Sequence, residues 1–136
     1  MNDLDFVEHV VSLLAQDDVH TWIFGGWAEE LRGLAAPGEH ADVDLLHPAE
    51  TWDEVDELDY DWIAGKRFPW KRAFRLEGTM VELFLVQRDA HGWYTELERR
   101  RHDWPENVFA TERRLPVAST AALVGYRYSH GLDAAA

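Results

Sequence analysis

Two glycines, Gly25 and Gly26, constrain the fold of this chain more than any other feature of its sequence. They end a short extended run, residues 20–24, and open residues 26–34, which have the composition of a helix. A glycine pair can turn sharply and leaves backbone N–H groups uncovered at the positive end of a helix, an arrangement that receives phosphate. The sequence therefore predicts a strand, a tight turn and a helix that face an anionic ligand.

A pair of aspartates, Asp42 and Asp44, follows the glycines after about sixteen residues, within His-Ala-Asp-Val-Asp-Leu-Leu. We expect residues 43–46 to continue as a strand. Side chains two residues apart on a strand point the same way, so both carboxylates can reach one divalent metal cluster. Such a pair alone is weak evidence, because surface strands and turns often contain one. Its combination with the diglycine makes a metal site the favoured interpretation.

Apolar spacing predicts two further helices around these strands. Residues 4–15 carry apolar side chains at helical intervals and are expected to pack on a sheet. Pro48 suits the first turn of another helix, which would carry Trp52, Val55 and Leu58 on one face.

The second half of the chain predicts a hairpin and a last helix. Residues 72–77 and 80–86 are expected to pair as strands around a tight turn. Ser119 or Thr120 can cap a helix that runs through Tyr128. The order of elements predicts an α/β (α+β) domain with a mixed sheet flanked by helices.

Length and composition limit the function. A chain of 136 residues suits one compact domain, so we expect residues 1–136 to form a single domain. With 13 basic and 26 acidic residues the formal charge is −13, which repels nucleic-acid backbones and makes a nucleic-acid partner unexpected. The same acidity would attract a cationic small molecule, or would simply favour solubility. The absence of cysteine, of a cationic leader and of a long apolar run predicts a cytoplasmic protein without a membrane partner.

These motifs together resemble the signature of the polymerase-beta-like nucleotidyltransferases, and most of all that of the small aminoglycoside and lincosamide nucleotidyltransferases. The matching positions are Gly25, Gly26, Trp27, Glu30, Gly33, His40, Asp42 and Asp44. The resemblance also implies a third carboxylate on a neighbouring strand, and Glu82 is the one acid within the apolar residues 80–86. Weaker similarity extends to residues 115–119. The chain departs from the family at Gly38-Glu39, where an arginine usually stands, and in having glutamate at both 30 and 82.

The resemblance implies a transferase that moves a nucleoside monophosphate, AMP from ATP, onto a hydroxyl of a small molecule, as in antibiotic resistance. Asp42, Asp44 and Glu82 would hold two Mg²⁺ ions, which suit carboxylate ligands, and Glu82 would take the proton of the acceptor hydroxyl. A homodimer could complete the acceptor pocket that larger relatives build with an extra helical domain. The alternative is a regulatory or partner-binding protein of the toxin–antitoxin type. The missing arginine favours this alternative and the intact acids oppose it.

Other candidate residues have two interpretations each. Gly25, Gly26 and Trp27 are expected to contact the nucleotide. Lys71, Arg72 and Arg75 belong to the only dense basic stretch, and we expect them to bind the β- and γ-phosphates. That stretch could equally balance the acidic residues 50–61.

Two acids and a histidine complete the candidates. Glu82 could form a salt bridge with Arg72 or Arg75 instead of binding metal, since a lone acid in an apolar strand needs a partner. His40, with Glu30, could contact the substrate, or His40 could cap its own turn.

Overall fold

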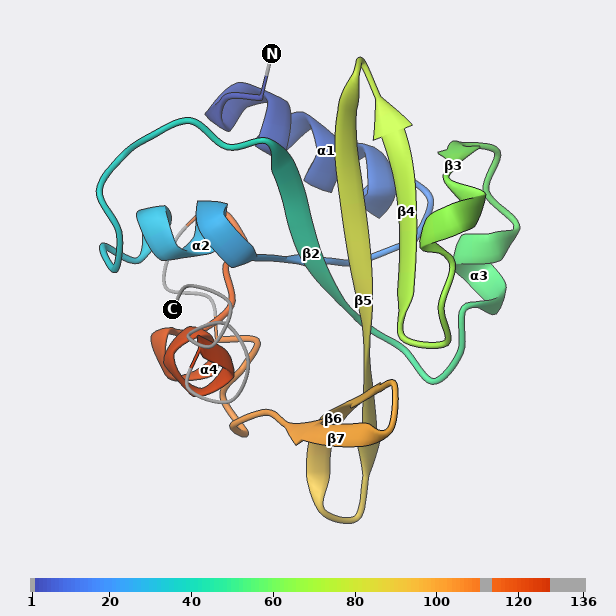
Figure 1. Ribbon diagram of the computed structural model, residues 1–136, viewed down its shortest axis with the longest axis vertical. Coiled ribbons are helices and arrows are strands. Elements are labelled where there is room, and N and C mark those ends of the chain that lie inside the picture. The colour runs from blue at the N-terminus through green and yellow to red at the C-terminus, as the bar shows by residue number, and fades with distance from the viewer. Residues whose placement is uncertain (1, 111–113, 128–136) are drawn as a thin grey trace.

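The computed structural model describes residues 2–110 and 114–127 of the chain. In this part of the chain a mixed sheet is accompanied by short helices (Figure 1). The strands are β1 (Trp22–Phe24), β2 (Asp42–Pro48), β3 (Asp61–Trp62), β4 (Lys71–Leu76), β5 (Thr79–Asp89), β6 (Gly92–Leu97) and β7 (Arg100–Asp103). The helices are α1 (Leu4–Gln16), α2 (Gly25–Leu31), α3 (Asp53–Asp56) and α4 (Thr120–Tyr126), with a 3₁₀ turn η1 (Ala64–Lys66). The expected mixed α/β architecture is confirmed.

The sheet has the strand order β1-β2-β5-β4-β3, and β6 and β7 extend it from the far end of β5. β2 and β5 pair in parallel, whereas β1 pairs with β2, and β4 with β5, in the antiparallel sense. In the parallel pair Asp44 lies opposite Glu82. This register decides which side chains of the two strands share a face.

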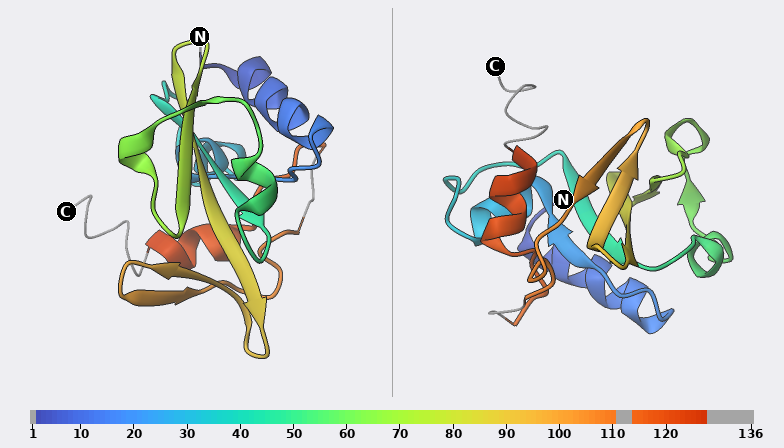
Figure 2. Two further views of the ribbon diagram at one scale, coloured as in Figure 1. Left: turned by 90° about the vertical axis from the view of Figure 1, so that its right-hand side faces the viewer. Right: turned by 90° about the horizontal axis from the view of Figure 1, so that it is seen from below.

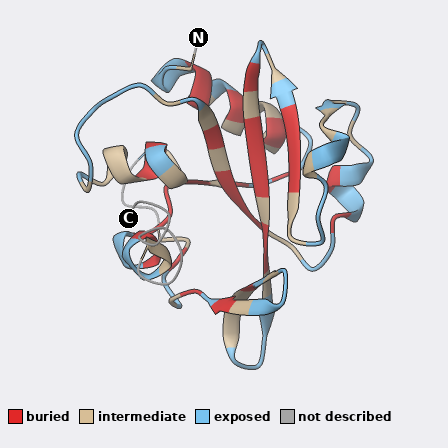
Figure 3. Cartoon of the chain, viewed as in Figure 1, coloured by how far each residue is buried: buried red, intermediate tan, exposed pale blue. Residues whose placement is uncertain are grey.

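One face of the sheet is buried beneath α1, which lies along it (Figure 2). The apolar side of α1 joins the same core as the inward side chains of β2 and β5, and Figure 3 shows both as buried. The fully buried residues of β2 and β5 on this face are Val43, Leu45, Val81 and Leu83, and Ile23 of β1 and Phe74 of β4 lie opposite two of them. Because side chains alternate along a strand, Asp42, Asp44 and Glu82 lie on the opposite face.

The C-terminal part of the described chain is fastened to the free edge of β1. The Ile23 N–H donates to the Pro116 carbonyl at 2.8 Å, and the Ala118 N–H donates to the Ile23 carbonyl at 2.9 Å. Arg32 reinforces this contact by donating to the carbonyls of Val117 and Ala118. Residues 115–119 therefore lead α4 to a position beside α2 (Figure 1).

Several predicted elements are confirmed. The helix over residues 4–15 is α1, and the hairpin is β4–β5, whose turn residues Glu77 and Gly78 both have positive φ, as a tight hairpin turn requires. Ser119 caps α4 by accepting from the Ala122 N–H. The predicted end of that helix at Tyr128 lies outside the described residues.

One expectation about local structure is wrong, and one hairpin was not predicted. Pro48 does not begin a helix, because β2 continues through it in register with β5, opposite Val86. The helix starts only at Asp53 and lasts a single turn. The β6–β7 hairpin was not predicted, since its charged residues lack the apolar run that marks a buried strand.

None of the helices in residues 2–110 and 114–127 combines the length and the apolar content needed to cross a bilayer.

Candidate active site

Three carboxylates share the face of the sheet opposite α1. Asp42 and Asp44 are two residues apart on β2, and Glu82 stands beside Asp44 on β5. The pKa of Asp44 is raised to about 7, first by burial and then by the negative charges of Glu82 and Asp42. The charges of Glu82 and Asp42 therefore both act on the Asp44 carboxyl.

Lys71 supplies the opposing charge at this face. Its Nζ lies 2.8 Å from Glu82 Oε2, and the two side chains are only 14% and 10% exposed. The same ammonium lies 5.4 Å from the centroid of the Phe84 ring. Lys71 is therefore the salt-bridge partner of Glu82, in place of the Arg72 or Arg75 that the sequence suggested.

The carboxylates fit a divalent cation by their chemistry. Oxygen donors are the ligands that Mg²⁺ prefers. The raised pKa of Asp44 reflects first its burial and then the negative charges of Glu82 and Asp42, which a cation would offset. Within the described residues, however, no group of three or more Asp, Glu or His side chains is placed so that it could hold a metal ion. Glu82 is directed to Lys71 in this arrangement.

The two glycines make room for side chains of the protein itself. A Cβ on Gly25 would lie 2.3 Å from Asp44 Oδ2, and Gly25 has φ +62°. A Cβ on Gly26 would lie 2.9 Å from His40 Nδ1. No other residue type combines this backbone conformation with this close approach at position 25. The diglycine therefore seats the Asp44 carboxylate and the His40 ring against the start of α2.

The side chains of Trp27, Glu30 and His40 contact one another and form a clamp at the start of β2. His40 Nε2 and Glu30 Oε1 lie 2.9 Å apart, and this contact, followed by the Gly38 N–H, lowers the pKa of Glu30. The Trp27 ring centroid is 4.3 Å from that of His40, and Trp27 is only 6% exposed. The sequence predicts that Trp27 contacts the nucleotide. In the structure its indole is packed inside the protein, against His40. The clamp instead fixes the turn that leads into Asp42.

Asn2 completes the clamp and was not predicted from the sequence, where nothing distinguishes it. Its Nδ2 donates to the carbonyls of His40 at 2.8 Å and Asp42 at 3.1 Å, and its Oδ1 accepts from Trp27 Nε1 at 2.9 Å. These three bonds hold the start of β2 against α2.

Asn2→Ala is expected to lower the free energy of unfolding by about 1 to 3 kcal/mol, because it leaves the buried Trp27 N–H without an acceptor. Urea unfolding followed by circular dichroism measures this loss. Asn2→Asp serves as the matched variant, since it keeps the acceptor for Trp27 and removes the donor to the two carbonyls. A fully stable Asn2→Ala protein would contradict the proposed clamp.

The basic residues of the predicted phosphate site divide between the two faces of the sheet. Lys71 and Arg75 have the same strand parity as Glu82 and lie on its face. Arg72 lies on the other face, where it is 7% exposed and its Nε donates to Asp56 Oδ1 at 2.8 Å. Arg67 binds the same carboxylate. The sequence predicts that Arg72 binds phosphate. Because Arg72 is one residue after Lys71 on β4, its side chain lies on the face of the sheet opposite the carboxylates.

Two aromatic residues, Phe24 of β1 and Tyr126 of α4, lie near the carboxylates. Tyr126 was not singled out from the sequence. Its ring centroid is 5.0 Å from that of Phe24, the residue opposite Asp44 in β1. Burial, and then the charge of Asp44, raise the pKa of Tyr126, with a further contribution from Glu82. The phenol thus stays protonated at neutral pH beside both carboxylates.

The fold expected from the sequence, a mixed sheet flanked by helices, is confirmed by its likeness to solved structures. The chain is similar to the lincosamide antibiotic adenylyltransferase LnuA in its lincomycin-bound form, with 17% identity, a TM-score of 0.69, and coverage of 90% of this chain and 84% of that one. It is also similar to ANT(2″)-Ia in complex with adenylyl-2″-tobramycin, with 18% identity, a TM-score of 0.63, and coverage of 96% and 76%. At these identities the likeness is one of fold. No protein-family model and no curated protein sequence matches the chain.

Proposed function

We propose that this protein is a metal-dependent nucleotidyltransferase that moves a nucleoside monophosphate, AMP from ATP, onto a hydroxyl of a small molecule. One observation carries the proposal: Asp44 lies opposite Glu82 in the parallel β2–β5 pair, with Asp42 on the same face and the diglycine turn against it. The fold likeness to structures that hold lincomycin and an adenylylated tobramycin supports an antibiotic of this type as acceptor.

In the proposed reaction the acceptor oxygen attacks the α-phosphorus of ATP. A new phosphorus–oxygen bond forms, the bond to the bridging oxygen breaks, and pyrophosphate leaves. The hydroxyl proton passes to the Glu82 carboxylate, directly or through water. Lys71, 2.8 Å from Glu82, fixes the direction of that carboxylate. Asp42, Asp44 and Glu82 would hold Mg²⁺, which supplies neutralisation of the phosphate charge and of the leaving group.

The residues around the carboxylates have supporting roles in this proposal. Gly25 and Gly26 keep Asp44 and the nearby backbone accessible to the nucleotide, and Arg75 adds positive charge on the same face of the sheet. Glu30 and His40 position Asp42 through the clamp rather than contact the reacting atoms.

Magnesium is expected to raise the melting temperature of the protein at neutral pH. The cation would relieve the repulsion among the three carboxylates, and binding at ten times the dissociation constant adds about 1.4 kcal/mol to the folded state. Thermal melts with and without MgCl₂ measure the shift. The Asp42→Asn, Asp44→Asn double variant should lose it, whereas equal shifts in both proteins would assign the metal to another place.

Transfer itself is tested by incubating the protein with labelled ATP, MgCl₂ and a panel of aminoglycosides and lincosamides. Appearance of labelled, nucleotidylated antibiotic together with pyrophosphate supports the proposal. Absence of transfer to every acceptor, combined with tight binding of a protein partner, would favour the regulatory function instead.

A further inference from the structure

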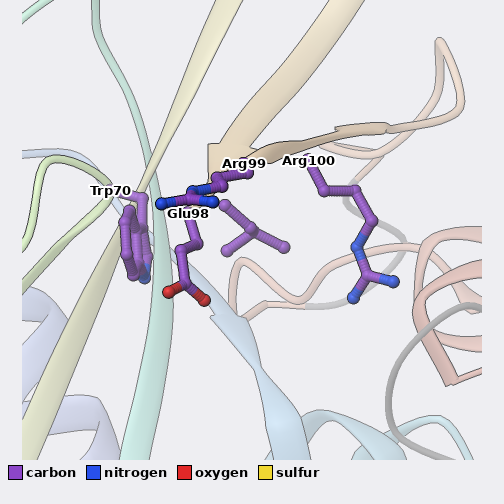
Figure 4. Close-up of a pocket in the computed structure, with 5 residues that line it drawn as sticks. Trp70, Glu98, Arg99 and Arg100 are labelled. Carbon is purple, nitrogen blue, oxygen red and sulfur yellow. The ribbon is translucent and has the colours of Figure 1, made fainter.

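A pocket of about 460 Å³ lies beneath the turn between β6 and β7. Its lining residues are Trp70, Leu97, Glu98, Arg99 and Arg100. In Figure 4 the Glu98 and Arg99 side chains lie beside the Trp70 indole, and the Arg100 side chain hangs from the other end of the same turn. The turn is tight, since Leu97 pairs directly with Arg100 and Glu98 has φ +47°. The pocket is therefore lined by the side chains of two consecutive arginines, Arg99 and Arg100, and by the indole of Trp70.

The two arginines of this pocket form no salt bridge among the described residues, whereas most other arginines of the described chain pair with a carboxylate. Arg99 and Arg100 are exposed, and across residues 2–110 and 114–127 no carboxylate lies within ion-pair distance of either. Arg101, the next residue, is paired with both Asp89 and Asp103. Glu98 is the only acid among the lining residues, so the pocket is net positive on a chain whose formal charge is −13.

The pocket is linked to the three carboxylates through Trp70 and Tyr126. Trp70 immediately precedes Lys71, whose ammonium pairs with Glu82. On the other side, Arg100 and the carboxylates flank the same phenol, because the charge of Arg100 lowers the pKa of Tyr126 while that of Asp44 raises it. A ligand that spans from the carboxylates to the turn would meet both arginines.

The basic stretch expected to bind phosphate is largely committed elsewhere. Arg67 and Arg72 share the Asp56 carboxylate, and Lys71 is held by Glu82. A substrate that carries several phosphate charges needs opposing charge near the site, and guanidinium groups bind phosphate oxygens in a bidentate manner.

We propose that the pocket under the β6–β7 turn binds a phosphate group of a substrate, with Arg99 and Arg100 as its ligands and Trp70 as the surface for an attached ring. This inference rests on the proposed nucleotidyl transfer and assigns a binding site to it. The phosphate belongs either to the triphosphate of the nucleotide or to a phosphorylated acceptor. Both sources share the chemistry that the pocket recognises.

Binding is tested by isothermal titration calorimetry of the whole chain with sodium tripolyphosphate, with a non-hydrolysable ATP analogue and with ribose 5-phosphate. The Arg99→Gln, Arg100→Gln variant should weaken the relevant phosphate at least about tenfold, the scale of two charge-assisted contacts. The matched control is Arg88→Gln, Arg114→Gln, which removes two exposed charges that pair with Glu106 and Glu8 away from the pocket. The control should change affinity less than about twofold, because such distant charges are screened.

The three ligands distinguish the two sources. If the pocket receives the triphosphate, the pocket variant loses affinity for tripolyphosphate and for the ATP analogue, and Trp70→Ala weakens only the analogue. If it receives a phosphorylated acceptor, affinity for the ATP analogue is unchanged, and ribose 5-phosphate binding to the protein saturated with that analogue is lost.

Glu98→Gln tests independently whether the charge of the pocket governs phosphate binding. Removal of this carboxylate should tighten phosphate binding, because it takes away a like charge, and weaker phosphate binding would contradict recognition of phosphate by this pocket. The proposal is overturned by that result, by equal affinities in the pocket variant and the control, or by the lack of binding of all three phosphates to the wild-type protein. None of these measurements needs turnover, so phosphate binding without transfer would refute only the proposed function.

Discussion

Asp44→Asn is expected to reduce nucleotidyl transfer at least about a thousandfold, the scale of losing a major electrostatic contribution to the transition state. Asp44 lies among the other carboxylates but takes no part in the α1 core, so the fold should persist. The measurement is turnover with whichever acceptor the antibiotic panel identifies. Asp53→Asn is the control of equal charge, since Asp53 is exposed on α3. Turnover close to the wild type in Asp44→Asn would refute the mechanism.

The same substitution should stabilise the metal-free protein at high pH, which separates lost activity from lost folding. The pKa of Asp44 is about 7 in the folded protein, against an ordinary value of 3.8. Between about pH 4 and pH 7 the folded state therefore binds more protons than the unfolded state, and the stability of the wild type falls as pH rises. After allowance for solvent screening, Asp44→Asn should remove a penalty of about 2 kcal/mol at pH 8 and almost none at pH 4. Urea unfolding at the two pH values measures the difference.

Gly25→Ala is expected to cost about 3 kcal/mol or more in the free energy of unfolding and to abolish transfer. The added methyl would overlap Asp44 Oδ2 at 2.3 Å, and the backbone at φ +62° disfavours any side chain. Gly33→Ala is the matched control, because Gly33 has φ +75° and no neighbour within 4 Å of the added Cβ. The control should lose only the backbone preference, about 1 kcal/mol. Equal losses at the two glycines would mean that the contact with Asp44 has no energetic weight.

A double-mutant cycle isolates that contact. Asp44→Ala removes the carboxylate that collides with the new methyl, so the Gly25→Ala, Asp44→Ala protein should recover the steric part of the lost stability. Transfer should remain absent in the double variant, because the metal ligand is missing. If the losses of stability are additive, the whole effect of Gly25→Ala comes from its unfavourable backbone conformation and not from the contact with Asp44.

The local part of the fold could be predicted from the sequence because its signals are local. The spacing of apolar residues gives α1, the Glu77-Gly78 turn gives the β4–β5 hairpin, and the diglycine gives the start of α2. The shared face of Asp42 and Asp44 follows from strand periodicity, while the assignment of Glu82 came from the family resemblance.

The rest depends on register and on distant pairings. Arg72 and Lys71 are adjacent in sequence, and only the register of β4 against β5 decides that Lys71 reaches Glu82. Asn2 lies 40 residues from Asp42 along the chain, so its hydrogen bond has no local signal. The β6–β7 turn acquires its place near the carboxylates through the far end of β5, which no local pattern reveals.

The strand β5 runs without interruption from Thr79 to Asp89 and therefore fixes a distance along the sheet. One end of this strand carries Glu82, and the other carries the hairpin with Arg99 and Arg100. A strand advances about 3.3 Å per residue, so the backbone of β5 sets the span between Glu82 and the point at which the chain turns into β6. Insertion of one residue into β5 would reverse the faces beyond it, whereas a longer β6–β7 turn would change the reach of the arginines and leave the carboxylates in place. Under the proposed function, the length of the substrate could therefore change through the β6–β7 turn while the aspartates stay as they are.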